Sequence, residues 1–146
     1  MNILVGSIKM FIKEVPIITS KNEVELQDIA AKYGFSPAII DTTNTDKSCF
    51  IHMEDIDALC LADVYGEDPS DIPNWIWDQI RIMVITLIEE EGIEYPDITP
   101  YNFIEKDNRI YMIDFGDAIY INNNESISWF VQEFISGENS WNPDYK

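Results

Sequence analysis

The sequence predicts an α+β fold in which a small N-terminal β-sheet with one helix precedes a mainly helical C-terminal part. Residues 8–15 alternate apolar and polar side chains, which is the pattern of a half-buried strand. Residues 20–33 lie between a start signal and a stop signal of a helix, and residues 73–91 carry an apolar stripe at helical spacing. The chain has 146 residues, enough for one compact domain with a sizeable core.

The N-terminal part is predicted to begin with a strand and a helix. The strand over residues 8–15 ends at Pro16, because proline lacks the N–H that a strand ladder needs. The helix over residues 20–33 begins with a capping box, in which Ser20 and Glu23 satisfy each other's backbone donors. A glycine directly after the helix is a typical stop signal.

Short elements follow the first helix. Residues 38–41 and 47–53 are predicted to form two strands around a polar turn. Residues 57–65 are expected to form a short helix, and residues 66–71 form an acidic, turn-rich connection. These elements complete the small sheet and lead into the helical part.

The longest predicted helix covers residues 73–91, with a proline at its start and Gly92 as its stop. Its apolar positions recur at helical spacing and are expected to face the core. They are Ile76, Ile80, Val84, Leu87 and Ile88. A second, shorter helix is predicted over residues 126–135, and the residues after it are mostly polar.

The segment of residues 95–116 contains a predicted hairpin with acidic and amide side chains at its open end. Two short apolar runs flank the turn residues 106–109. Folding about this turn places Asn102 and Asp114 side by side, with Asp97 on the loop just before. Two oxygen side chains of this kind suit Mg²⁺, which is usually shared between protein groups and substrate phosphates.

The pattern D-x-x-x-x-N followed by D-F-G resembles the catalytic-loop and metal-binding signature of protein kinases. Asp-Ile-Thr-Pro-Tyr-Asn is similar to the small atypical kinases of the KEOPS complex and, more distantly, to the RIO kinases. Those families often carry Thr or Ser where this chain has Thr99. The resemblance implies a minimal protein-kinase-like fold, with a reduced N-lobe over residues 1–55 and a minimal C-lobe over residues 56–146.

The resemblance also implies roles for the residues of this segment. Asp97 would orient the attacking hydroxyl, and Asn102 and Asp114 would hold the metal. The chain departs from the family just upstream, where Tyr95 replaces the usual His and Pro96 replaces Arg or Gly. Because that His supports the loop by packing and hydrogen bonding, the departure concerns the geometry of the loop more than its chemistry.

In the N-terminal part, the resemblance assigns Lys13 to the phosphates, although a solvent-facing strand lysine explains that residue equally well. Glu23 would be the ion-pair partner of Lys13, with Glu25 as the second choice. A capping role competes for the Glu23 side chain. The segment Glu54-Asp55-Ile56 would be the hinge whose backbone pairs with the adenine edge.

Composition narrows the classes of function. The net charge of −18 argues against nucleic-acid binding, which needs Lys and Arg, and against docking on anionic membranes. It does not exclude ATP, because a metal ion bridges carboxylates and phosphates. No apolar run approaches a membrane span, and the first residues lack the long apolar segment of a signal peptide. We therefore expect a cytoplasmic protein, or one of the host cytoplasm if the source is viral.

Three hypotheses follow. The first is a phosphotransferase that uses ATP and Mg²⁺ to phosphorylate a hydroxyl of a protein or small molecule. The second is a pseudokinase that binds a protein partner without catalysis, because Gly6 is the only glycine before Lys13 and the chain after D-F-G is short. The third is an acidic interaction module without nucleotide chemistry, which Asn102 and Asp114 lying far apart would favour.

Overall fold

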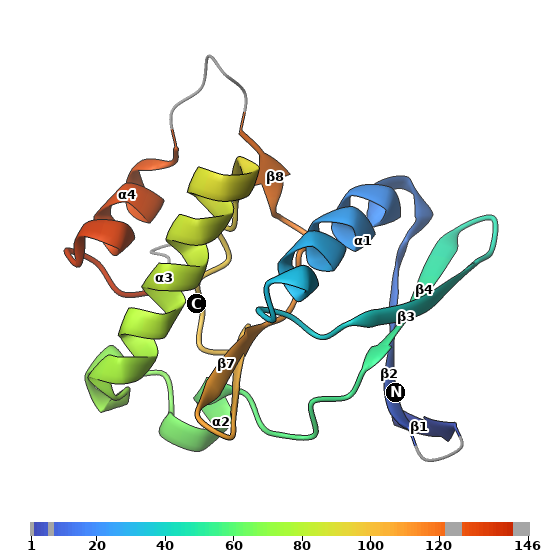
Figure 1. Ribbon diagram of the computed structural model, residues 1–146, viewed down its shortest axis with the longest axis horizontal. Helices are drawn as coiled ribbons and strands as arrows, with labels where there is room; N and C mark the ends of the chain where they lie inside the picture. Colours follow the sequence, from blue (N-terminus) through green and yellow to red (C-terminus); the bar gives the residue numbers. More distant parts are fainter. Residues whose placement is uncertain (1, 6–7, 122–126, 142–146) are drawn as a thin grey trace.

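A four-stranded antiparallel sheet forms the N-terminal part of the protein (Figure 1). The computed structural model describes residues 2–5, 8–121 and 127–141. The strands lie in the order β1-β2-β4-β3. Their bounds are Asn2–Val5 for β1, Ile8–Pro16 for β2, Ile39–Asn44 for β3 and Ser48–Glu54 for β4. The strands predicted over residues 8–15 and 47–53 are confirmed. The strand predicted over residues 38–41 forms but continues to Asn44, through part of the expected turn, and β1 was not foreseen.

Helix α1 (Ile17–Lys32) follows β2 without a loop, so it begins earlier than predicted. The predicted capping box is wrong. Pro16 is the N-cap, and the Ser20 hydroxyl lies inside the helix and donates to the Ile17 carbonyl at 2.9 Å. The Ile17 N–H instead donates to the Lys47 carbonyl at 2.9 Å. A neighbouring turn of the sheet therefore satisfies the first helical donor, and Glu23 is free for another partner.

Helix α1 packs between the sheet and the rest of the molecule. One small apolar cluster joins the sheet to the helix, and it consists of Val15, Cys49, Ile51 and Met53 with Ile17, Val24 and Ile39 packed against it. Leu26 and Ala30 on the same helix belong to the larger core of the C-terminal part. The helix thus connects both cores, and the division of the chain at residue 55 stays a prediction.

The C-terminal part is built around helix α3 (Asn74–Glu91), which lies next to α4 (Trp129–Ser136) (Figure 1). The other elements are α2 (Leu61–Tyr65), a 3₁₀ turn (Pro69–Asp71), β5 (Ile93–Glu94), β6 (Phe103–Lys106), β7 (Arg109–Met112) and β8 (Ile119–Tyr120). The predicted apolar stripe of α3 is confirmed as core, with Ile88 only partly buried. Gly92 ends the helix in the left-handed conformation that a glycine C-cap favours.

The hairpin predicted between Asn102 and Asp114 is confirmed. Strands β6 and β7 pair in register from Phe103 opposite Met112 to the turn. Asp107 and Asn108 both have positive φ, at 52° and 63°, as a tight two-residue hairpin turn requires. The Ile113 N–H donates to the Asn102 carbonyl at 2.9 Å, which brings the residues at the open end together.

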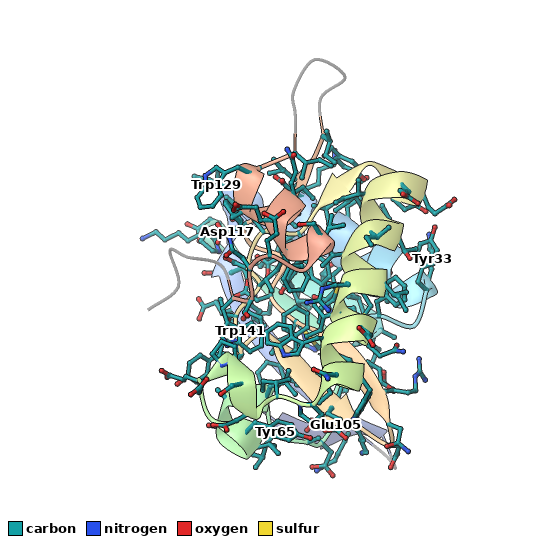
Figure 2. All side chains as sticks on the ribbon, turned by 90° about the vertical axis from the view of Figure 1, so that its left-hand side faces the viewer. Tyr33, Tyr65, Glu105, Asp117, Trp129 and Trp141 are labelled. Atoms are coloured by element: carbon teal, nitrogen blue, oxygen red, sulfur yellow. The ribbon has the colours of Figure 1, made fainter. Side chains whose placement is uncertain are left out.

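Three local predictions differ from the structure. The helix expected over residues 57–65 forms only from Leu61, because the preceding residues cross from the sheet to the C-terminal part. The two-stranded sheet of β5 and β8 was not foreseen, since two-residue strands carry no periodic signal. Trp141 (labelled in Figure 2) lies in the tail that was expected to be mostly polar, yet it is 9% exposed and packs on Trp77 with ring centroids 4.4 Å apart.

Glu94 joins β5 to the start of α4 and is the basis of a stability prediction. Its carboxylate is 4% exposed and accepts from the Ser128 N–H at 2.7 Å and the Ser128 hydroxyl at 3.1 Å. We expect Glu94→Ala to lower the free energy of unfolding by about 2 kcal/mol in urea titrations, because it leaves the two half-buried Ser128 donors without their acceptor. Glu90→Ala, on an exposed position of α3, serves as the control. Equal effects of the two substitutions would contradict the role of Glu94.

Candidate functional site

A cavity of about 370 Å³ lies between the sheet and the β6–β7 hairpin, and its size is typical of small-molecule sites. Its walls combine apolar side chains with Lys13, Asn102 and Asp114. The complete lining is Phe11, Lys13, Pro37, Met53, Glu54, Asp55, Ile56, Ala58, Asn102, Ile104, Ile113 and Asp114. The structure therefore places the predicted lysine, hinge and hairpin residues around one space.

Lys13 on β2 joins the neighbouring helix α1 to Asp114, which lies 101 residues away in the sequence. Its ammonium lies 2.5 Å from Glu23 Oε2 on α1 and 3.2 Å from Asp114 Oδ1, which follows β7. Because α1 starts directly after β2, Glu23 lies on the second helical turn, within reach of Lys13. Glu25 is exposed and interacts with Tyr120 instead. The structure thus brings together the first of the two pairs that the sequence left open.

The surroundings of Lys13 keep its side chain charged. Burial by itself lowers the pKa of Lys13, but the hydrogen bond that Lys13 donates to Glu23 and the charges of Asp114 and Glu23 outweigh this effect. The net effect raises the pKa above the ordinary value for lysine. A positive charge at this wall of the cavity is suited to an anionic ligand.

Asp114 adopts an unusual backbone conformation, with φ at 67°. Its Oδ1 accepts from the Gly116 N–H at 3.1 Å as well as from Lys13. A non-glycine residue in the left-handed region is unfavourable and persists only where its surroundings hold it, which often happens at functional sites. The conformation directs the Asp114 carboxylate to the cavity wall.

Tyr95 provides the support for this conformation. It is 1% exposed, and its hydroxyl donates to the Ile113 carbonyl at 2.5 Å, directly before Asp114. Its ring packs edge-on against Phe103 and Phe115, with centroids 6.0 Å and 5.2 Å away. Tyr95 therefore supplies the packing and the hydrogen bond for which the kinase resemblance expects a histidine.

Asn102 lies opposite Asp114 at the open end of the hairpin. Its amide nitrogen donates to the Asp97 carbonyl at 2.9 Å, which leaves its amide oxygen available for a cation. Within residues 2–5, 8–121 and 127–141, no group of three or more His, Cys, Asp or Glu side chains is arranged to hold a metal ion. Asn102 and Asp114 supply two oxygen-bearing side chains to this wall of the cavity, and Mg²⁺ is often held by one or two protein groups together with substrate phosphates.

Asp97 lies beside a carboxylate that sequence reasoning did not single out, that of Asp117. Burial, a hydrogen bond with Asp117 and the charges of Asp117 and Asp114 raise the pKa of Asp97 to about 7, while Lys13 opposes the shift. Asp117 is exposed and lies at the edge of the molecule in Figure 2. The sequence did contain a signal for this neighbour. Asp117 is the acidic residue directly after D-F-G, at the point where the chain returns to the loop of Asp97.

The predicted hinge crosses the opposite wall of the cavity. The Glu54 N–H donates to the Ala38 carbonyl at 2.9 Å, and the Asp55 N–H donates to the Lys9 carbonyl at 3.3 Å. Among the described residues, no hydrogen bond uses the Ile56 N–H, and Asp55 Oδ2 is buried without a partner. The hinge therefore leaves one donor and one acceptor unsatisfied next to the cavity.

Burial and the carboxyl groups of Asp117 and Asp114 disfavour the ionised form of Asp97, so Asp97→Asn is expected to stabilise the protein in the absence of Mg²⁺. A folded-state pKa near 7 means that ionisation of Asp97 disfavours folding as the pH rises from about 4 to 7. We expect Asp97→Asn to raise the free energy of unfolding by about 1 kcal/mol at pH 8, after allowance for solvent screening, and by less at pH 5. Denaturant titrations in EDTA at both pH values check this, and a larger gain at pH 5 would contradict it.

Comparison with known proteins places this arrangement in a family. The model of the RIO domain matches residues 18–134, a span that runs from α1 into α4. The chain belongs to the RIO domain family. The sequence predicted a reduced kinase-like protein and a minimal protein-kinase-like fold. Both predictions are confirmed.

A curated relative and a solved structure agree with this assignment. The chain is 26% identical over 129 residues to the "Probable serine/threonine-protein kinase BUD32 homolog" of Archaeoglobus fulgidus. The match covers 88% of this chain, and the chain spans 60% of the length of that relative. The structure of the Cydia pomonella granulovirus kinase PK-1 aligns with a TM-score of 0.66 at 13% identity, covering 77% of this chain and 44% of that chain. The second likeness concerns the fold alone.

The comparisons leave the roles of individual residues to experiment. The described part of the chain contains no helix long and apolar enough to cross a membrane. Lys13, Asn102 and Asp114 line the cavity, whereas Glu23 contacts Lys13 and the Asp97 carbonyl contacts Asn102. The catalytic and binding roles of these five residues are proposals.

Proposed function

We propose that this chain binds ATP with Mg²⁺ in the cavity and transfers the terminal phosphoryl group to a hydroxyl of a protein or small molecule. The observation that carries the proposal is the contact of the Lys13 ammonium with Glu23 and Asp114 at the cavity wall. Three segments converge there on one charged group that is suited to phosphates. The similarity to a relative named as a serine/threonine-protein kinase supports the same reaction class.

The cavity has the chemical features that a nucleotide requires. Phe11, Met53 and Ile113 offer apolar surface to a base. The unpaired Ile56 N–H and the orphaned Asp55 carboxylate oxygen offer polar contacts to its edge. Lys13 lies on the wall that the phosphates would face, and a charge-assisted hydrogen bond between an ammonium and a phosphate is among the stronger contacts a protein makes.

The metal would be held by Asn102 and Asp114, and it would neutralise charge on the phosphates. The amide oxygen of Asn102 and the carboxylate of Asp114 are oxygen donors of the kind Mg²⁺ prefers. Asp97 would accept a hydrogen bond from the acceptor hydroxyl and orient it. Its neighbour Asp117 would add negative charge at the place where the acceptor approaches.

The second candidate is a pseudokinase that binds nucleotide or a partner protein without transfer. One structural observation favours it: burial and the neighbouring Asp117 carboxyl raise the pKa of Asp97 to about 7, which leaves its carboxyl partly protonated near neutral pH and a weaker acceptor for a hydroxyl. The sequence adds that the region before Lys13 contains a single glycine, Gly6, which lies outside the described residues. The acidic-module hypothesis loses its premise, because Asn102 and Asp114 line the same cavity.

Calorimetry with Mg-ATP tests the nucleotide claim. The wild type is expected to bind, and Asp114→Ala is expected to weaken Mg-ATP binding at least about tenfold, through loss of a charged ligand to the metal. Asp46→Ala, on an exposed turn, is the matched control and should bind like the wild type. A wild type without detectable binding would overturn the proposal.

Incubation with labelled ATP separates the two candidates. An active kinase transfers label to itself or to a generic acceptor, and Asp97→Asn lowers this rate about a hundredfold or more while leaving ATP affinity nearly unchanged. Binding without transfer, in both Mg²⁺ and Mn²⁺, would instead support the pseudokinase.

A cytoplasmic location, or one in the host cytoplasm, stays a prediction.

A further inference from the structure

The residue directly after the hinge adopts an unfavourable conformation and contacts neighbouring side chains. Asp57 has φ at 58°, in the left-handed region that non-glycine residues rarely adopt. It directly follows the three hinge residues Glu54, Asp55 and Ile56. A conformation of this kind persists only where contacts determine it, so the contacts around Asp57 carry information about the function of the hinge.

Two lysines contact the end of the hinge: Lys9 binds Asp57, and Lys106 binds the Ile56 carbonyl. Lys9 on β2 forms an ion pair with Asp57, Nζ to Oδ1 at 2.7 Å, and Asp55 Oδ1 accepts from the Asp57 N–H at 2.8 Å. Lys106, at the end of β6, donates to the Ile56 carbonyl at 2.8 Å. The second contact joins the hinge to the hairpin that carries Asn102 and Asp114, across 50 residues of sequence.

The contact with Lys106 determines which backbone group of Ile56 remains for a ligand. The carbonyl is occupied by an ammonium, whereas no hydrogen bond among the described residues uses the N–H. The Ile56 carbonyl belongs to the Ile56–Asp57 peptide, whose N–H donates to Asp55 Oδ1, so this peptide is held at both ends and anchors Ile56 beside the peptide that carries its own N–H. The hinge is therefore held in a form that offers a donor to the cavity.

We propose that Lys106 is a positioning residue for base recognition, which anchors Ile56 through its carbonyl, keeps the Ile56 N–H available as a donor and so selects adenine over guanine. This inference rests on the proposed function. Adenine carries an acceptor at N1 beside its amino group, which complements a backbone donor next to an acceptor such as Asp55. Guanine carries N1–H and a carbonyl at the same positions, so donor meets donor and acceptor meets acceptor.

The test compares the dissociation constants of Mg-ATP and Mg-GTP in lysine variants. Lys106→Met removes the ammonium and keeps the apolar part of the side chain, whereas Lys106→Arg keeps a charged donor. Lys21→Met, on the exposed face of α1, is the matched control. We expect Lys106→Met to lower the preference for ATP over GTP about tenfold, Lys106→Arg to restore it largely, and Lys21→Met to leave it unchanged.

The outcomes separate this inference from the proposed function. If Lys106→Met binds ATP and GTP with the same preference as the wild type, the role of Lys106 is overturned and the proposed function is not. The same holds if Lys106→Met weakens ATP binding and GTP binding by equal factors. A wild type that binds neither nucleotide would overturn the proposed function, and the inference with it. Circular dichroism checks folding, and Lys106→Gln, whose side chain is too short for the bond, replaces Lys106→Met if that variant does not fold.

Discussion

Replacing Lys13 by methionine is expected to weaken ATP binding about a hundredfold and to destabilise the fold. The affinity falls because the phosphates lose a charged hydrogen-bond donor. The fold is destabilised because Glu23, whose side chain is 5% exposed, loses the ammonium at 2.5 Å. We expect the free energy of unfolding to fall by about 3 kcal/mol, since a buried charge without its partner is costly.

A double variant separates the two effects. Glu23→Gln in the Lys13→Met background removes the unpaired buried charge and should recover much of the lost stability, while ATP affinity stays low. Urea titrations and calorimetry on the single and double variants give both quantities. Recovery of ATP affinity in the double variant, or a normal affinity in Lys13→Met alone, would contradict the assignment of Lys13 to the phosphates.

Tyr95→Ala is expected to have the largest effect on stability, lowering the free energy of unfolding by about 4 kcal/mol. The ring is almost fully buried and packs edge-on against Phe103 and Phe115, so its removal leaves a cavity beside the hairpin. It also leaves the Ile113 carbonyl without its donor. The melting temperature of the variant provides the measurement.

Tyr95→Phe isolates the hydroxyl. It keeps the ring contacts and removes only the hydrogen bond to Ile113, so we expect a loss of about 1 kcal/mol. Because that bond holds the residue before Asp114, ATP binding should weaken in the presence of Mg²⁺ more than in EDTA. Equal stability losses in the alanine and phenylalanine variants would show that the ring contributes little, against the packing described here.

The pairing of Lys13 illustrates where sequence reasoning needed the structure. The residues from Ser20 to Glu23 match a capping box, and the same glutamate suits an ion pair with the strand lysine. The choice depends on where the helix starts. The Lys47 carbonyl, on a distant turn of the sheet, accepts from the Ile17 N–H and moves the start to Pro16. Glu23 thereby becomes an interior residue of the helix that faces Lys13.

The site shows the same division between local and distant information. The hairpin and the approach of Asn102 to Asp114 follow from a two-residue turn and the pattern beside it, so they were predictable. The contact of Asp97 with Asp117 and the bond of Lys106 to the Ile56 carbonyl join segments that share no local pattern. Nothing in the spacing of these residues indicates that they meet.

The sequence by itself determined the type of most helices and strands, the apolar face of α3 and the tight turn between β6 and β7. These features depend on periodicity and on the conformational preferences of a few neighbouring residues. Only the tertiary structure decided the partner of Lys13, the support of Asp114 by Tyr95 and the form of the hinge. Those features depend on contacts between segments distant in the sequence, which form when the sheet, α1 and the hairpin pack around one cavity.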